Sequence, residues 1–302
     1  MPYKLIKIPM GTSTCQLVSN VNISENITGL CYVNDLGFLF LVRDSHCIGL
    51  ITNSGKIEFP WMGEYNTKGN EDGTMPLFEY PSSICYSPTY KICYLLENGG
   101  SKLRNINVHN KYASSGMSSI VSKNIERYFS KSDNYNNFQT YCDIDDRANV
   151  YWIITELNRC MIFNREYSIA ENYIGNGRSG FSTSNCLSEC LMNKPRGLRY
   201  FKGELYICDA NNHCIRKVKD RVMSIVAGNP MAKDYKDGIG VECLMNNPSS
   251  LVSHGNIMYF IDNNKIRYLS LPDHNVGTIY ESNNITSIEI NNRNDLLVLE
   301  KV

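Results

Sequence analysis

The chain has 302 residues, and its 30 Lys and Arg side chains balance 30 Asp and Glu, so the formal net charge is zero. No global electrostatic field therefore draws it to nucleic acid or to an anionic membrane. Hydrophobic residues make up 42 % of the chain and charged residues 20 %, which supports a full apolar core and excludes intrinsic disorder.

Apolar runs such as residues 38–42 are far shorter than the ~20 residues of a membrane helix. The first residues also lack the apolar stretch of a signal peptide. We therefore expect a cytoplasmic chain that is not secreted and has no membrane partner. The 36 Asn and 29 Ile against 6 Ala are typical of an AT-rich genome, and a virion is the alternative location.

A repeat decides the architecture, because the sequence ECLMNKP at residues 189–195 recurs as ECLMNNP at residues 242–248. Each copy precedes a short strand, an aromatic-rich strand that ends in Asp, a third strand after an Asn-rich turn, and a fourth strand. Four short strands in a unit of about 50 residues are typical of a β-propeller blade.

Weaker copies of this pattern continue upstream, and each chain end supplies two further strands, at residues 3–8 and 15–18 and at residues 287–290 and 295–300. Pairing the two ends removes the unpaired strand edges of an open ring. The sequence thus predicts an all-β fold, a single six-bladed β-propeller domain of four-stranded blades whose last blade is closed by N- and C-terminal strands. The expected blades are residues 21–62, 63–112, 113–175, 176–228, 229–281, and 282–302 with 1–20.

Two motifs resemble those of NHL-repeat β-propellers: DANNHCIR at residues 209–216, and VAG at 226–228 followed by DGIG at 237–240. The resemblance is close over residues 174–270 and loose elsewhere. It implies the propeller fold but leaves function open, because similar propellers serve as protein-binding scaffolds, RNA-binding modules, lyases, lactonases and extracellular assembly domains.

The twelve cysteines follow the blade repeat rather than a disulfide pattern, and no Cys-x-x-Cys is present. A small apolar residue at equivalent positions is typical of core packing. The equivalent sets are Cys31, Cys85 and Cys142 on first strands, and Cys47, Cys160 and Cys214 on third strands. A metal or disulfide at Cys186, Cys190 and Cys243 on the loops before two blades remains open.

Acidic residues end the second strands of five blades. A ring of carboxylates could bind a cation, but a carboxylate before an Asn-rich turn more simply accepts the backbone N–H groups of that turn. We interpret the set as structural turn carboxylates: Asp44, Glu97, Asp209, Asp262 and Glu300, with Thr155 in the remaining blade.

Catalytic motifs are missing from the sequence. None of the five histidines falls on a predicted first strand, and no nucleophile elbow, phosphate-binding loop or zinc-helix motif occurs. We therefore predict no catalytic residue, no metal and no cofactor. A calcium-dependent lactonase-like site would need acidic side chains that face the channel, for which Glu289 and Asp143 are the candidates.

Residues 194–221 hold eight Lys and Arg against three acidic residues, a local excess of five positive charges. Such a face could bind the phosphates of RNA, although alternate residues of a strand point to opposite sides. The candidate binding residues are Arg196, Arg199, Lys202, Arg216 and Lys217.

The leading functional hypothesis is a non-enzymatic protein-interaction or structural scaffold with an unidentified protein partner, as a component of a larger assembly such as a virus particle. It rests on the absence of a catalytic set and on loops of very different length, notably residues 112–137. The alternatives are a metal-dependent propeller hydrolase, lactonase or lyase, and an RNA-binding propeller. The neutral charge argues against a nucleic-acid partner, and the oligomeric state is left open.

Overall fold

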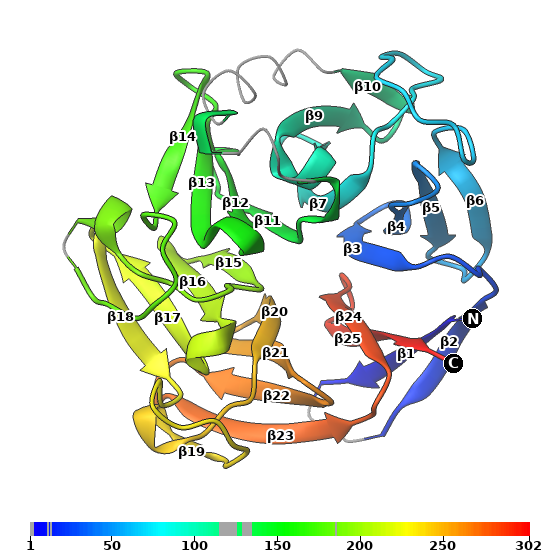
Figure 1. Cartoon of the computed structure of the whole chain (residues 1–302). Helices are drawn as coiled ribbons and strands as arrows, with labels where there is room; N and C mark the ends of the chain where they lie inside the picture. The colour runs from blue at the N-terminus through cyan, green and yellow to red at the C-terminus, as the bar shows by residue number, and fades with distance from the viewer. Residues whose placement is uncertain (1–2, 11, 13, 115–125, 129–134, 185) are drawn as a thin grey trace.

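The structure is a computed structural model that describes residues 1–302 except 1–2, 11, 13, 115–125, 129–134 and 185. In the described residues the regular elements are 25 strands and seven short 3-10 helices. None of these helices has the length and hydrophobicity needed to cross a lipid bilayer. The strands form six antiparallel sheets arranged as blades around a central axis (Figure 1).

Each blade consists of consecutive strands, from the axis outward, and the sixth combines both chain ends. Blade I is β3 (Ile27–Val33), β4 (Gly37–Val42), β5 (Cys47–Thr52) and β6 (Ile57–Met62); blade II is β7 (Pro81–Ser87), β8 (Ile92–Glu97), β9 (Lys102–Asn107) and β10 (Tyr112–Ser114). Blade III is β11 (Thr140–Ile144), β12 (Val150–Ile154), β13 (Arg159–Asn164) and β14 (Ile169–Ile174); blade IV is β15 (Leu198–Phe201), β16 (Glu204–Asp209), β17 (Cys214–Lys219) and β18 (Val222–Ala227). Blade V is β20 (Pro248–His254), β21 (Ile257–Asp262), β22 (Lys265–Ser270) and β23 (Asn275–Glu281), with β19 (Gly238–Ile239) on its outer edge; blade VI is β24 (Ile285–Ile290), β25 (Asp295–Lys301), β1 (Tyr3–Pro9) and β2 (Gln16–Val21).

The predicted six-bladed, all-β propeller closed by both termini is confirmed. The structure adds strands that the sequence pattern did not reveal, the outer strands β10 and β14 and the short β19. Outer strands bury only one face, so β14 carries the polar residues Glu171 and Asn172 and shows no continuous apolar run.

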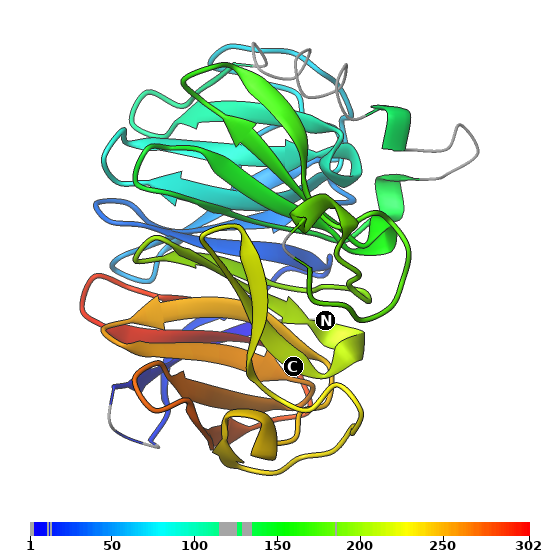
Figure 2. The same ribbon diagram turned by 90° about the vertical axis from the view of Figure 1, so that its left-hand side faces the viewer.

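The connections divide between the two faces of the disc. We call leaders the segments that join the fourth strand of one blade to the first strand of the next, and leader face the side on which they lie with the turns between second and third strands. Figure 1 looks onto the leader face, and Figure 2 shows the leaders of blades IV and V projecting from it. The leaders also hold helices: η5 (Leu187–Glu189) and η7 (Gly240–Glu242), with η2 (Glu126–Tyr128) and η3 (Tyr135–Asn137) before blade III.

Three further helices form the turns after second strands: η1 (Asn98–Gly100), η4 (Thr155–Leu157) and η6 (Ala210–Asn212). In η4 and η6 the turn closes on a residue in the left-handed region, Asn158 and His213 respectively. Asn is among the residues that tolerate this conformation best, so Asn-rich turns favour the reversal.

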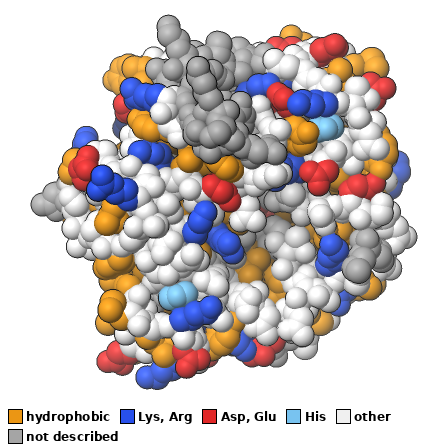
Figure 3. All heavy atoms as spheres, in the orientation of Figure 1, with side chains coloured by type: hydrophobic (Ala, Val, Ile, Leu, Met, Phe, Trp, Pro, Cys, Tyr) orange, Lys and Arg blue, Asp and Glu red, His pale blue; other side chains and the backbone are white. Residues whose placement is uncertain are grey.

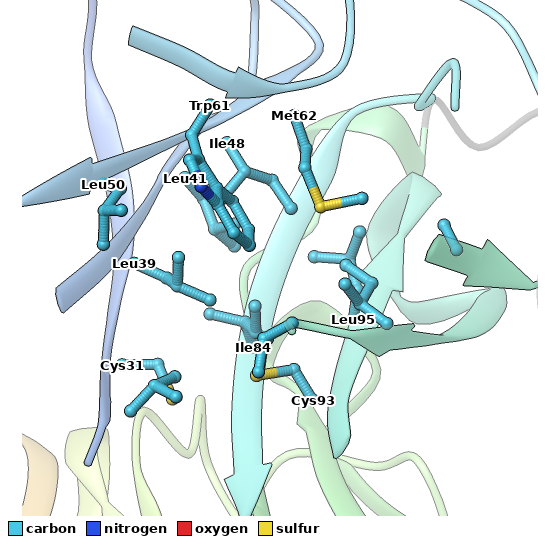
Figure 4. Close-up of a cluster of buried hydrophobic side chains, with 14 of the residues drawn as sticks. Cys31, Leu39, Leu41, Ile48, Leu50, Trp61, Met62, Ile84, Cys93 and Leu95 are labelled. Atoms are coloured by element: carbon cyan, nitrogen blue, oxygen red, sulfur yellow. The ribbon is translucent and has the colours of Figure 1, made fainter. Parts of the chain in front are cut away.

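The core lies between the blades, because each middle strand packs against both neighbouring sheets. All six residues of β4 and all five of β12 are buried, so these strands are almost continuously apolar. Figure 4 shows the cluster between blades I and II, in which Leu41 and Ile48 pack with Leu95. Equivalent clusters fill the other blade interfaces.

Strand β1 closes the ring. It pairs with β25 on one side, where Leu5 lies opposite Leu299, and with β2 on the other. Leu5 and Tyr3 are buried in the cluster that joins blade VI to blade I. The N-terminus therefore supplies both hydrogen bonds and apolar packing to the sheet that the C-terminus begins.

Deletion of residues 1–20 should unfold the protein or make it oligomerise, because it exposes the edge of β25 and the apolar side chains beneath β1. Size-exclusion chromatography and thermal unfolding of the truncated chain check this expectation. A truncated monomer that melts at the temperature of the parent would contradict closure by β1.

Candidate functional site

The first strands of the six blades surround a central cavity of about 330 Å³. Three charged side chains line it in the described structure, Asp143 on β11, Arg199 on β15 and Glu289 on β24. They come from three different blades, so they lie near one another only because the blades form a closed ring.

Asp143 and Arg199 form an ion pair across neighbouring blades, with 3.4 Å between Arg199 Nη1 and Asp143 Oδ1. The backbone N–H of Tyr200 donates to Asp143 Oδ2 at 2.7 Å, and Arg199 Nε donates to Ser253 Oγ of blade V at 3.1 Å. Burial raises the pKa of Asp143, and the Arg199 cation opposes this shift. The carboxylate in turn raises the pKa of Arg199. The pair links blades III, IV and V.

Glu289 is the third charged residue of the cavity and has a strongly shifted pKa. Burial raises the pKa of its carboxyl to about 7, with Arg199 lowering it and Asp143 raising it further. Its Oε1 accepts the N–H of Ile290 at 2.9 Å. A carboxyl group with this pKa gains or loses its proton near neutral pH. Asp143, by contrast, is paired with the Arg199 cation.

The cavity does not fit the metal that a lactonase-like propeller would require. The described residues contain no group of three or more His, Cys, Asp and Glu side chains able to hold a metal ion. Asp143 is bonded to Arg199 and Tyr200, which leaves Glu289 as the remaining acidic side chain of the lining. The histidines also lie elsewhere: His46 is buried in a turn on the leader face, where its Nδ1 accepts the N–H of Tyr80 at 3.2 Å.

The acidic residues at the ends of second strands are built into buried ion pairs in three blades. Glu97, Asp209 and Asp262 are fully buried. Each pairs with an arginine on the third strand of its own blade, at 2.7 Å for Glu97–Arg104, 3.0 Å for Asp209–Arg216 and 2.8 Å for Asp262–Arg267. The longer Glu97 side chain reaches the Nε of its arginine, whereas the two aspartates reach Nη1.

These ion pairs hold the leaders, and we call them leader clamps. The three carboxylates accept backbone N–H groups of the leaders, from Glu79, Asn193 and Asn246. The three arginines donate to leader carbonyls, those of Glu71 at 2.7 Å, Leu191 at 2.8 Å and Leu244 at 2.7 Å. The backbone N–H groups bonded to the three carboxylates therefore belong to the preceding leader. They do not belong to the turn that follows the second strand.

The remaining members of the acidic set differ. Glu300 is buried and pairs with Lys4 of β1 at 2.7 Å, which adds an ion pair to the closure of blade VI. In blade III the hydroxyl of Thr155 donates to the Pro195 carbonyl at 2.7 Å, a contact to a leader without charge. Asp44 is exposed and follows the end of β4 by two residues.

The five candidate basic residues do not lie on one surface. Arg199 lines the cavity, Arg216 is fully buried in a leader clamp, and Lys217 pairs with Glu204 at 3.2 Å. Lys202 is exposed in the turn between β15 and β16, on the face opposite the leaders. Arg196 is partly buried at the leader side of β15. Strand alternation and the needs of the blade separate them, as the sequence pattern indicated.

All twelve cysteines are free. Cys190 and Cys243 are buried in their leaders, and Cys186 is exposed. The third-strand set, Cys47, Cys160 and Cys214, is fully buried between blades. The first-strand set, Cys31, Cys85 and Cys142, instead lines the central cavity, because first strands form its wall.

Loss of one member of a leader clamp should be costly. Arg267→Met leaves Asp262 charged and buried without its partner, which should lower the free energy of unfolding by about 3–5 kcal/mol. The control Lys217→Met disrupts the partly exposed pair with Glu204 and should cost at most about 1 kcal/mol. Urea unfolding of both variants measures the difference, and equal losses would show that burial does not set the strength of the clamp.

The raised pKa of Glu289 predicts a pH dependence of stability. The native state holds this proton more tightly than the unfolded state, whose carboxyl keeps the ordinary value of 4.5. Its contribution is therefore fully present below about pH 4.5 and is lost as the pH rises through about 7. Glu289→Gln should remove this loss and become more stable than the parent at pH 8 by roughly 1–3 kcal/mol.

Urea unfolding of parent and variant between pH 5 and 8 checks this expectation. The exposed Glu166→Gln variant is the matched control and should track the parent across the range. A constant difference between parent and Glu289→Gln at every pH would contradict the raised pKa.

Comparisons with known proteins agree with this architecture. The NHL repeat model matches residues 192–218. No curated protein sequence matches the chain. Among solved structures, an auxiliary nutrient binding protein from Bacteroides ovatus has 13 % identity and a TM-score of 0.62. The match covers 95 % of this chain and 62 % of the nutrient binding protein.

Two enzymes have a similar fold. A gluconolactonase from Xanthomonas campestris has 8 % identity and a TM-score of 0.58, with coverage of 91 % of this chain and 85 % of its own. A catalytically inactive virginiamycin B lyase from Staphylococcus aureus with quinupristin has 11 % identity and a TM-score of 0.56, with coverage of 99 % and 100 %. Identities this low show a shared fold alone.

The segment that matches the NHL repeat includes β15, β16 and most of β17 in blade IV. It contains Asp209 and Arg216 of one leader clamp. The chain is a six-bladed β-propeller, and its blade IV contains a segment that matches the NHL repeat.

Proposed function

We propose that this protein is a non-enzymatic protein-interaction scaffold that binds its partner on the leader face of blades IV and V. The observation that carries the proposal is a group of exposed apolar side chains on these two leaders. Met231 is 92 % exposed, Ile239 57 %, Val241 55 % and Phe181 39 %. Figure 3 shows hydrophobic side chains at the rim of this face, over these blades.

The leaders that carry these side chains are held in place. In blade IV, Arg216 donates to the carbonyls of Leu191 and Ser182, and its guanidinium lies 4.9 Å from the centre of the Phe181 ring. This cation–π contact fixes the ring next to the clamp. Phe181 is thus an exposed aromatic side chain on a rigid support.

The blade V leader has a second set of supports. Arg267 donates to the Lys236 carbonyl at 2.9 Å and to Asp237 Oδ1 at 3.0 Å. Asp237 also accepts the backbone N–H of Thr278 at 3.0 Å, and β19 within the leader pairs with β23. Ile239 therefore projects from a loop that is part of the blade sheet.

Rigid loops with exposed apolar side chains suit protein recognition. A loop that is already ordered loses little conformational entropy on binding, so more of the contact energy appears as affinity. Met and aromatic residues are enriched at the centres of protein interfaces. The charges around them are mixed, Lys233 and Lys236 with Asp234 and Glu242, which favours a partner with an apolar patch over a polyanion.

The groups of the cavity support the non-enzymatic reading in a second way. Asp143 and Arg199 satisfy one another, and the described lining offers one further ionisable carboxyl, that of Glu289. The role in a larger assembly, including a virus particle, is a further proposal that rests on composition.

A photo-crosslinking experiment tests the binding face. We expect p-benzoylphenylalanine at position 231 or 239 to crosslink a defined protein in cells that express the full chain, because these positions lie on the proposed face. The same residue at position 167 is the control, since Tyr167 is 66 % exposed in the turn between β13 and β14 on the opposite face.

The partner so identified should bind the double variant Met231→Asp, Ile239→Asp at least tenfold more weakly than the parent, since two desolvated apolar contacts are lost. Tyr167→Asp should leave the affinity unchanged. Crosslinks of equal strength from both faces, or crosslinks to RNA alone, would overturn the proposal, the latter in favour of nucleic-acid recognition.

A further inference from the structure

Two cysteines on neighbouring first strands lie together in the wall of the central cavity. Cys85 is on β7 of blade II and Cys142 on β11 of blade III, and both side chains line the cavity. Ser83, two residues before Cys85 on β7, contacts Cys142 Sγ at 3.2 Å, so the two cysteines lie on facing parts of neighbouring strands. Neither belongs to the leader face, so what they do is independent of the protein-binding function proposed above.

We propose that Cys85 and Cys142 are a redox-active dithiol that hydrogen peroxide converts to a disulfide between blades II and III. The oxidant is small: a peroxide molecule is little larger than water, whose share of liquid volume is about 30 Å³, and the cavity holds about 330 Å³. The reaction needs no protein oxidant and no movement of a blade to admit one.

The surroundings give the two sulfurs different roles. The hydroxyl of Ser83 donates to Cys142 Sγ at 3.2 Å and accepts the backbone N–H of Cys142 at 3.0 Å. These two bonds fix the position of the Cys142 side chain in the cavity wall. Cys142 is also partly exposed to the cavity. It is the thiol that meets the oxidant.

Cys85 is suited to the second step. It is 5 % exposed, and its Sγ donates to the carbonyl of Tyr94 at 3.9 Å. The neighbouring Cys142 thiol and burial both raise the pKa of the Cys85 thiol. Cys85 therefore stays protonated while Cys142 reacts, and it lines the same cavity as the atom that it must attack.

The two steps balance. The Cys142 thiolate attacks one oxygen of hydrogen peroxide, the O–O bond breaks, and sulfenic acid forms with loss of hydroxide, which takes up the proton that Cys142 released. The sulfur of Cys85 then attacks the sulfenic sulfur, the S–O bond breaks, and the Cys85 proton leaves with the hydroxyl group as water. Two thiols are oxidised to one disulfide, and one peroxide is reduced to two water molecules.

A neighbouring thiol pair serves as an internal comparison. Cys31 also lines the cavity and lies in one apolar cluster with Cys93. Cys93 is fully buried on β8 within the apolar cluster between blades I and II, and Figure 4 shows both residues among those side chains. Cys93 does not line the cavity, so dissolved peroxide does not reach it as it reaches Cys142.

The first experiment uses the unaltered full chain. After treatment with hydrogen peroxide, digestion without reductant and mass spectrometry should show one new crosslink, between the peptides of Cys85 and Cys142, that dithiothreitol reverses. The disulfide closes a long chain loop, so the thermal transition should move to higher temperature. If both thiols remain open to alkylation after unfolding, while exposed Cys186 is oxidised, the proposal is wrong.

The second experiment assigns the roles. In Cys85→Ser the sulfenic acid has no thiol to resolve it, so dimedone should label Cys142 under peroxide, whereas the parent should give little adduct. Cys93→Ser is the matched control and should still form the Cys85–Cys142 crosslink. Labelling of Cys85 in Cys142→Ser at the rate seen for Cys142, or a crosslink from Cys31 instead, would overturn the assignment. Melting curves of each reduced variant show that it is folded before treatment.

Discussion

Every feature of this molecule depends on one constraint, the need to leave no strand edge unpaired inside the ring. Strand β1 meets that need by lying between β25 and β2, so two segments nearly 300 residues apart share one sheet. The pairing puts Leu5 opposite Leu299 and Lys4 within 2.7 Å of Glu300. Hydrogen bonds, apolar packing and a partly buried charge pair thus act at the same place, and the cavity exists only because the ring is closed.

Leader clamps solve a different problem, that of fixing long loops without helices. A buried carboxylate and a buried guanidinium are costly to desolvate, and the cost is offset only when most of their hydrogen-bonding atoms find partners. In blades II, IV and V these partners are backbone groups of the leader, so the ion pair is stable only when the loop has one conformation. The charge therefore specifies loop shape, which is what a recognition surface needs.

The repeat made the ring predictable, because a residue that recurs in every blade occupies the equivalent position in each of them. The ECLMN repeat and the second-strand acids located the blades and the clamp carboxylates. The repeat did not reveal that Arg216 is the buried partner of Asp209. The signal was present, because Glu97 and Arg104 have the same seven-residue spacing and Asp262 and Arg267 form the equivalent pair with a shorter one. Contacts between blades were beyond reach, since the Arg199–Asp143 pair joins residues 56 positions apart that share no pattern.

The cavity and the leader face differ in how a change at one position spreads. On the leaders, Phe181 and Ile239 have separate supports, so we expect them to respond separately to substitution. In the cavity the charges are coupled: Asp143 raises the pKa of Arg199, and both act on Glu289. Cys85 and Cys142 join the same wall, so a bond between blades II and III tethers β11, the strand that carries Asp143. Oxidation and protonation would therefore act on one set of first strands, while the arginines that hold the leaders of blades IV and V belong to third strands.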